Sequence, residues 1–142
     1  MLVRLLYASR SAEPVTSALI DSILAQSRSH NPENGITGIL CWGGDMFMQV
    51  LEGGRAEVNQ IYNRIVADTR HRDSVLLHYE EASERRFASW TMGQVNLAKI
   101  NPSIVLKYSA KPTLDPYAVS GRASMALLEE LIATASIIGR AG

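Results

Sequence analysis

Gln49 is a carboxamide inside a largely apolar stretch that runs from Asn34 to Gly53. A primary amide carries both a donor and an acceptor, so it can hold two different hydrogen-bond patterns in one place. Buried without a partner, it would cost about 1–3 kcal/mol. Two interpretations follow: a neighbouring backbone group satisfies Gln49, or the amide addresses a bound ligand.

Tyr7 is a second side chain that could do chemistry. It lies near the end of a β-like run, Leu2–Ala8, in which Arg4 alternates with apolar residues. This alternation predicts that Tyr7 faces the core, where a phenol usually finds a hydrogen-bond partner. A tyrosine that only packs near a strand end is the alternative.

Asn31 follows the first predicted helix. That helix should begin near Glu13-Pro14 and fade over Ser27–His30, because the residue before Pro32 is biased away from helical geometry. His30 and Asn31 are therefore predicted in a loop. Each could be a turn residue only.

Arg64 and Asp68 are four residues apart in a second predicted helix, from about Arg55 to Thr69. Such spacing is typical of a solvated ion pair. The same carboxylate, together with His71 at the helix exit, could instead meet a polar or anionic ligand.

The elements that position Gln49 are two β-favouring runs, Ile36–Trp42 and Asp45–Leu51, joined by Gly43-Gly44. Two glycines allow positive φ in a two-residue hairpin turn. That turn would place Gly38 opposite Gln49, leaving a flat space beside the amide. Both hairpin faces are largely apolar, so the hairpin should be central in its sheet.

Two further strands are predicted, at Ser74–Glu81 and Ser89–Leu97. The resulting order is β-α-β-β-α-β-β, an α+β, ferredoxin-like sheet with two helices on one face. Trp90 and Met92 are two apart in the last strand and should share one of its faces.

Residues 98–142 differ in kind from residues 1–97. Asn101-Pro102 opens a short helix, and Ser120 caps a second one that is predicted to reach about Ile138. The apolar stripe of the second helix consists of Met125, Leu128, Leu131, Ile132 and Ala135. This C-terminal helical pair must cover the bare sheet face, a second protomer or a partner, and we expect it to belong to the same compact unit.

Composition narrows the classes of function. The 142 residues carry 14 basic and 14 acidic side chains, which argues against electrostatic capture of nucleic acid or an anionic membrane. No apolar run approaches the ~18 residues of a membrane helix. The single cysteine, Cys41, excludes an internal disulfide and a multi-cysteine metal site. We expect a cytoplasmic protein with no metal.

The chain resembles the BLUF family of blue-light sensors that use flavin adenine dinucleotide (FAD). The matching stretches are LLYAS at Leu5–Ser9, His30-Asn31, NGITGILCWGGDMFMQVLEG at Asn34–Gly53, IYNRIVADTRH at Ile61–His71 and RRFASWTMG at Arg85–Gly93. They follow the family's order across nearly all of residues 1–97. The tail, with LKYS at Leu106–Ser109, resembles short, stand-alone members with two C-terminal helices and no fused output enzyme.

The resemblance implies roles for four residues in light sensing. Tyr7 matches the tyrosine that donates an electron and a proton to the excited flavin. Gln49 matches the glutamine between that tyrosine and the N5 and O4 edge of the flavin. Trp90 and Met92 match two residues whose placement is tied to signalling.

It also implies a cofactor site. Asn31 matches the asparagine that hydrogen-bonds the isoalloxazine ring. Arg64 and Asp68 match polar positions beside the flavin, and His71 lies near its phosphate-bearing side.

The implied function is a photoreceptor, which is a two-state switch and not an enzyme. Its expected partners are FAD, a second copy of the chain, and a separate output protein such as a response regulator or a cyclic-dinucleotide enzyme. Two alternatives stay open: a flavin-binding regulatory module without photochemistry, and a small acylphosphatase-like hydrolase in which Arg64 or Asn31 orients a phosphate. The sequence offers no convincing Ser-His-Asp or Cys-His set for catalysis.

Overall fold

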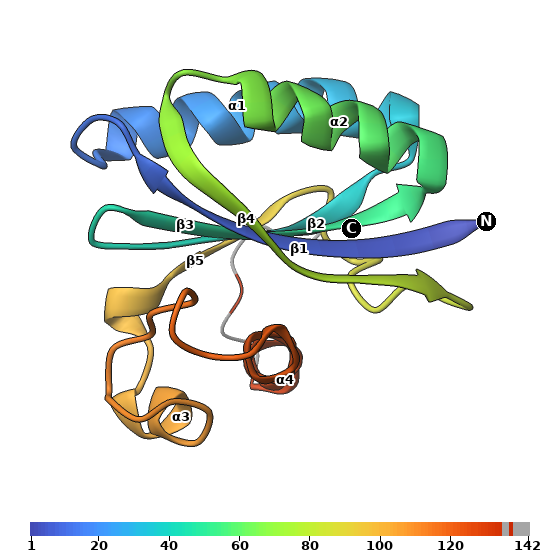
Figure 1. Ribbon diagram of the computed structural model, residues 1–142. Coiled ribbons are helices and arrows are strands. Elements are labelled where there is room, and N and C mark those ends of the chain that lie inside the picture. Colours follow the sequence, from blue (N-terminus) through green and yellow to red (C-terminus); the bar gives the residue numbers. More distant parts are fainter. Residues whose placement is uncertain (135–136, 138–142) are drawn as a thin grey trace.

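A five-stranded sheet in the order β4-β1-β3-β2-β5 separates two helical layers (Figure 1). The computed structural model describes residues 1–134 and residue 137. Its elements are β1 (Leu2–Ser11), α1 (Ser17–Asn34), β2 (Thr37–Gly43), β3 (Met46–Gly54), α2 (Arg55–Ala67), β4 (His71–Ala82), β5 (Gly93–Asn96), a short 3₁₀ helix (Leu97–Lys99), α3 (Pro102–Leu106) and α4 (Gly121–Ala133). The α+β class and the predicted element order are confirmed.

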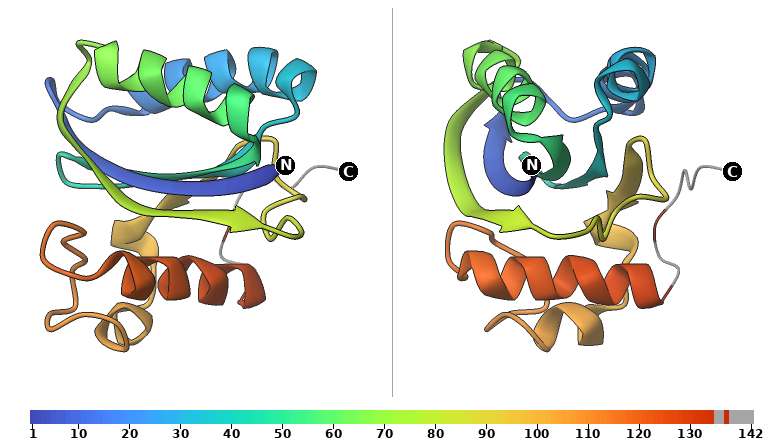
Figure 2. Two further views of the ribbon diagram at one scale, coloured as in Figure 1. Left: turned by 45° about the vertical axis from the view of Figure 1, so that its right-hand side comes forward. Right: turned by 90° about the vertical axis from the view of Figure 1, so that its right-hand side faces the viewer.

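Two hydrophobic cores lie on opposite faces of the sheet. In both views of Figure 2, α1 and α2 cover one face, while α4 runs across the other. The first core includes Tyr7, Leu24, Leu40, Phe47, Leu51 and Val58, and the second includes Leu6, Ile39, Met48, Val50, Leu128 and Leu131. Of the three possibilities for the C-terminal helical pair, the structure therefore shows α4 on the bare sheet face. The stripe residue Ala135 and the expected helix end at Ile138 lie outside the described residues.

Helix α1 runs past the predicted stop. It begins at Ser17, where Thr16 accepts a hydrogen bond from the Leu19 amide at 3.2 Å, and it continues through Pro32. A proline near the C-terminal end removes only one helical hydrogen bond, and Gly35, with φ of 66°, supplies the left-handed C-cap. Asn31 is therefore a buried residue near the end of a helix, and the predicted loop placement is wrong.

The hairpin is present, but its register differs from the prediction by two residues. Leu40, not Gly38, lies opposite Gln49, because the two turn residues are Gly44 and Asp45 and not Gly43 and Gly44. Gly44 has a φ of 59°. Side chains alternate with period two, so a two-residue shift leaves every residue on its predicted face. Gly38 lies opposite Leu51 and leaves no space beside the amide, since an added Cβ would collide with the Val50 carbonyl oxygen.

We expect Gly38→Ala to lower the free energy of unfolding by more than about 2 kcal/mol, because the collision is with backbone that cannot rotate away. Chemical denaturation measures the effect. Gly44→Ala is the matched control: its Cβ meets nothing within 4 Å, so only the positive φ opposes it, at about 1 kcal/mol. Equal losses in the two variants would contradict the close-approach explanation for Gly38.

The predicted strand Ser89–Leu97 is shorter in the structure. Only Gly93–Asn96 forms β5, which runs parallel to β2. Trp90 packs in the core under α4, whereas Met92 packs in the core under α1 and α2. The prediction that these two side chains share a face is therefore wrong, because the segment before β5 is irregular and not a strand.

Candidate functional site

A cleft opens between α1, α2 and the sheet, with about 1020 Å³ of empty space that is partly open to solvent. A mostly apolar cleft with a few convergent polar groups is typical of small-molecule sites. Its walls are apolar side chains such as Leu19, Ile23, Leu40, Phe47, Leu51, Ile61 and Ile65. Its polar side chains include Tyr7, Ser9, Asn31, Gln49, Arg64, Asp68, Arg70 and His71. The structure thus brings all six predicted cofactor-site residues to one cavity, and Trp90 lies outside it on the other sheet face.

Tyr7 and Gln49 are cross-strand neighbours on β1 and β3. The Tyr7 hydroxyl donates to Gln49 Oε1 at 2.5 Å, and both residues are only 4% exposed. Gln49 Nε2 in turn donates to Met92 Sδ at 3.3 Å. The amide is therefore held by two side chains, and not by the neighbouring backbone group that the simpler interpretation required.

Burial raises the pKa of the Tyr7 phenol well above its usual range, and the charges of Tyr62 and Asp68 act in the same direction. The ring of Tyr62 stands 5.5 Å from that of Tyr7 at an interplanar angle of 51°. Tyr7 consequently remains a neutral hydrogen-bond donor at any physiological pH.

Asn31 and Ser9 supply polar groups at the floor of the cleft. Asn31 Nδ2 donates to the Thr91 carbonyl oxygen at 3.2 Å, which ties the end of α1 to the segment before β5. Ser9 is fully buried, and its hydroxyl has no hydrogen-bond partner among the residues that the structure describes. Sequence reasoning missed Ser9, although alternation with Tyr7 places it on the same strand face. A buried hydroxyl without a partner is the kind of group that a ligand would satisfy.

Asp68 pairs with Arg70 instead of Arg64. Arg70 Nη2 lies 2.6 Å from Asp68 Oδ2, and the hydrogen bonds from Arg70 hold the pKa of that carboxyl below its usual value. Arg70 also donates to Gln26 Oε1 at 3.1 Å, which connects this rim to α1. The predicted Arg64–Asp68 ion pair is therefore wrong. Arg70 belongs to the helix exit Asp68-Thr69-Arg70-His71, which the sequence indicated as a possible contact for an anionic or polar ligand.

These groups fit FAD. An apolar slot between two helices accommodates a flat ring system, while the Ser9 hydroxyl and the Asn31 and Gln49 amides match its polar edge. The cationic side chains Arg64 and Arg70 lie on the same cavity wall and suit a diphosphate. No helix in the described part of the chain is long and apolar enough to cross a membrane.

Comparisons with known proteins point to a family that uses FAD. The family model for BLUF, described as sensors of blue-light using FAD, matches residues 2–93. The blue light- and temperature-regulated antirepressor of Escherichia coli K12 is 38% identical over 89 residues, which cover 61% of this chain and 22% of that protein. The photoactivated adenylate cyclase subunit beta of Euglena longa is 32% identical over 92 residues, covering 64% of this chain and 11% of the subunit.

A solved structure described as BlsA in its photo-activated state superposes with a TM-score of 0.81 at 31% identity, covering 93% of this chain and 95% of that one. The matched region is thus about a fifth of the antirepressor and a tenth of the cyclase subunit. It is nearly the whole of BlsA.

Proposed function

The chain belongs to the BLUF family, the sensors of blue light using FAD, and we propose that it senses light through a hydrogen-bond switch built from Tyr7 and Gln49. The observation that carries this proposal is the buried 2.5 Å hydrogen bond from the Tyr7 hydroxyl to Gln49 Oε1 in the wall of the cleft. When bound, FAD supplies the absorption of blue light and the acceptor for one electron. BLUF domains are sensors, and no substrate is consumed in this scheme.

Tyr7 is the electron and proton donor in this proposal. Its raised pKa keeps the phenol protonated in the dark, so the proton is present when the electron leaves. Loss of an electron makes a phenol strongly acidic, and the Gln49 oxygen lies in line to receive the proton. Tyr7 regains the electron and the proton at the end of the cycle, so charge and atoms balance.

Gln49 is the element with two states. In the structure the Gln49 amide accepts a hydrogen bond from the Tyr7 phenol and donates one to the Met92 thioether. Sulfur is a weak acceptor, so the second hydrogen bond is the weaker one. Rotation or tautomerisation of the amide would exchange donor and acceptor at this position. The changed hydrogen bonding beside the flavin is what shifts its absorption to the red.

An absorption spectrum of the purified protein, before and after blue light, tests the proposal. We expect the spectrum of an oxidised flavin in the dark and a reversible red shift after illumination. A flavin spectrum without the shift would favour the regulatory module, and a protein without flavin would favour a hydrolase.

Asn31 and Asp68 hold FAD in this scheme, together with Arg64 and His71. We expect Asn31→Ala and Asp68→Ala each to weaken FAD binding by about 1–3 kcal/mol, because each leaves polar groups of the cofactor unpaired. The ratio of flavin to protein absorbance after purification measures occupancy. Val66→Ala, on an exposed part of α2, is the control. Unchanged occupancy in both site variants would assign these residues to turn formation and surface pairing.

The signal leaves the pocket through the segment that holds Met92 and Trp90. Met92 contacts the Gln49 amide, and Trp90 packs in the core that α4 completes. Two relatives of the chain are a blue light- and temperature-regulated antirepressor and a photoactivated adenylate cyclase subunit. For this chain the output is a separate protein, such as a response regulator or a cyclic-dinucleotide enzyme, and the chain self-associates.

We expect Trp90→Ala and Met92→Ala to keep the flavin red shift but to change light-dependent assembly or partner binding. Neither side chain donates to the Tyr7–Gln49 pair. Met92 accepts from Gln49 in the core under α1 and α2, and Trp90 packs in the core under α4. Size-exclusion profiles in darkness and under blue light measure the response. Wild-type behaviour of both variants in assembly and partner binding would show that the signal takes another route.

A further inference from the structure

Residues 85–92 pass from one face of the sheet to the other around the end of β2. Phe87 and Trp90 belong to the core under α4, and Met92 belongs to the core beneath α1 and α2. The crossing occurs where the Gly38 amide donates to the Trp90 carbonyl oxygen at 2.9 Å. Strand β5 begins only afterwards, with Gly93 opposite Ile39.

Both ends of this crossing segment are tied to the same strand, β3. At one end, the Glu52 carboxylate accepts from the Phe87 amide at 2.5 Å and from the Arg86 amide at 3.0 Å. At the other end, Gln49 donates to Met92. Gln49 and Glu52 are three residues apart, so their side chains lie on opposite faces of the strand.

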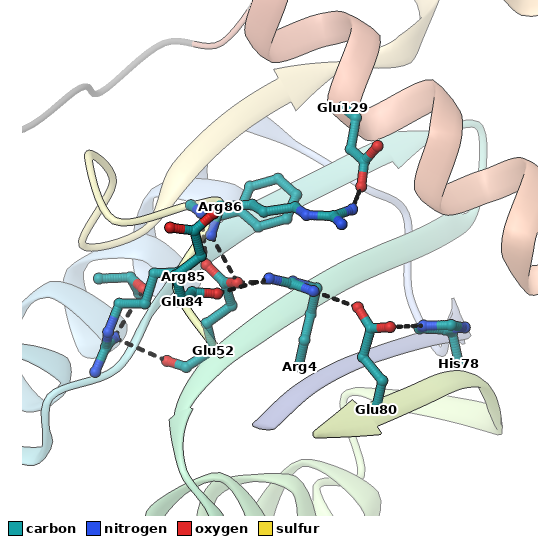
Figure 3. Close-up of polar contacts among 10 residues, drawn as sticks. Arg4, Glu52, His78, Glu80, Glu84, Arg85, Arg86 and Glu129 are labelled. Carbon is teal, nitrogen blue, oxygen red and sulfur yellow. Dashed lines mark hydrogen bonds and ion pairs between the residues drawn. The ribbon is translucent and has the colours of Figure 1, made fainter. Parts of the chain in front are cut away.

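The two attachments differ greatly in strength. Glu52 is 1% exposed, and Arg4 donates to the same carboxylate at 2.7 Å (Figure 3). Hydrogen bonds to an ionised acceptor are roughly twice as strong as neutral ones. The attachment at Gln49 is a neutral amide on a thioether sulfur, which is a weak acceptor. The backbone of residues 90–92 is also held, because the Trp90, Thr91 and Met92 carbonyl oxygens accept from Gly38, Asn31 and Arg28, respectively. A change in the amide would therefore release the Met92 side chain while the Glu52 attachment stays in place.

We propose that Glu52 is the fixed pivot of the signalling segment, a positioning residue that converts release of Met92 into displacement of Trp90 against α4. The inference rests on the proposed function, since Gln49 provides the release. With Arg86 and Phe87 held, release of the Met92 side chain changes the packing of residues 90–92, and Trp90 shifts against α4.

Two features connect the pivot to α4. Arg86 forms an ion pair with Glu129 of α4, so the held end of the segment is joined to that helix (Figure 3). Trp90 is buried in the core that α4 completes, yet its indole N–H has no hydrogen-bond partner within residues 1–134 and 137. An unpartnered buried donor disfavours the present placement and gives Trp90 a reason to move.

Residue-resolved amide hydrogen exchange of the FAD-loaded wild type, in darkness and under continuous blue light, tests the pivot directly. We expect the Arg86 and Phe87 amides to keep their dark protection, while amides of residues 90–92 and of α4 exchange differently in the light. Loss of protection at Arg86 and Phe87 to the same extent as at 90–92 would overturn the inference, and so would unchanged exchange at 90–92. Absence of a red shift in this sample would instead contradict the proposed function.

A pair of substitutions separates the pivot from a purely stabilising ion pair. Glu52→Gln removes the charge that holds the segment, whereas Glu80→Gln removes another carboxylate partner of Arg4 that accepts no hydrogen bond from residues 85–92. We expect both variants to retain FAD and the red shift. In Glu52→Gln the light-dependent exchange difference in α4 should fall by about threefold or more, and in Glu80→Gln it should stay at the wild-type value. Equal effects of the two substitutions on α4 would overturn the assignment, and the wild-type experiment stands even if Glu52→Gln does not fold.

Discussion

Gln49→Leu is expected to retain FAD and to lose the light-induced red shift entirely. Leucine occupies a similar volume in the core but can neither accept from Tyr7 nor donate to Met92. Affinity for FAD is spread over a cleft lined by many side chains, so one lost amide costs little binding. Absorption spectra before and after blue light measure both quantities in one sample.

The matched control is Gln60→Leu, which makes the same change on an exposed position of α2. It should bind FAD and show the wild-type red shift. A Gln49→Leu protein that still shifts normally would remove Gln49 from the mechanism.

Tyr7→Phe should bind FAD and lose the productive photocycle. The substitution keeps the ring that packs against Tyr62 and removes only the hydroxyl that donates to Gln49. Without that O–H, residue 7 supplies neither the proton for the Gln49 oxygen nor a readily oxidised phenol as electron donor. Transient absorption should still detect excitation of the flavin, but no red-shifted state should accumulate.

Tyr62→Phe is the control for Tyr7→Phe, because it alters the neighbouring phenol and leaves the Tyr7–Gln49 hydrogen bond in place. A full red shift in Tyr7→Phe would identify another donor. Trp90 lies on the opposite face of the sheet, so Tyr62 would then be the nearer candidate.

The β-hairpin shows how far local pattern reaches. Alternation along the two runs assigned Gln49 and Leu40 to one face and Met48 to the other, as the structure has them. The pairing partner of Gln49 could not be deduced in the same way. A turn at Gly43-Gly44 and a turn at Gly44-Asp45 give registers that differ by two residues, and both keep every side chain on the same face. The β3 backbone selects between them, because Gly38 must lie where the Val50 carbonyl leaves no room for a side chain.

The end of α1 and the segment before β5 show where local pattern misleads. Proline at position 32 predicts a stop, yet the helix continues because the Gly35 cap and burial of Asn31 outweigh one missing hydrogen bond. In a strand, residues two apart share a face, which predicts that Trp90 and Met92 lie on the same side. The segment that holds them instead crosses from one face of the sheet to the other. Neither outcome is encoded in the neighbouring residues alone.

The sequence by itself determined the order of the elements, the faces of the hairpin, the family resemblance and the six residues that meet in the cleft. The element order and the hairpin faces depend on periodicity and residue type, which are local properties of the chain, whereas the six site residues follow from the family resemblance. Tertiary structure was needed for the hairpin register, the pairing of Asp68 with Arg70, the place of the buried Ser9 in the cleft lining and the attachment of residues 86–87 to Glu52. Each of these depends on a contact between segments that the backbone must first bring together, and such contacts are selected by packing of the whole fold.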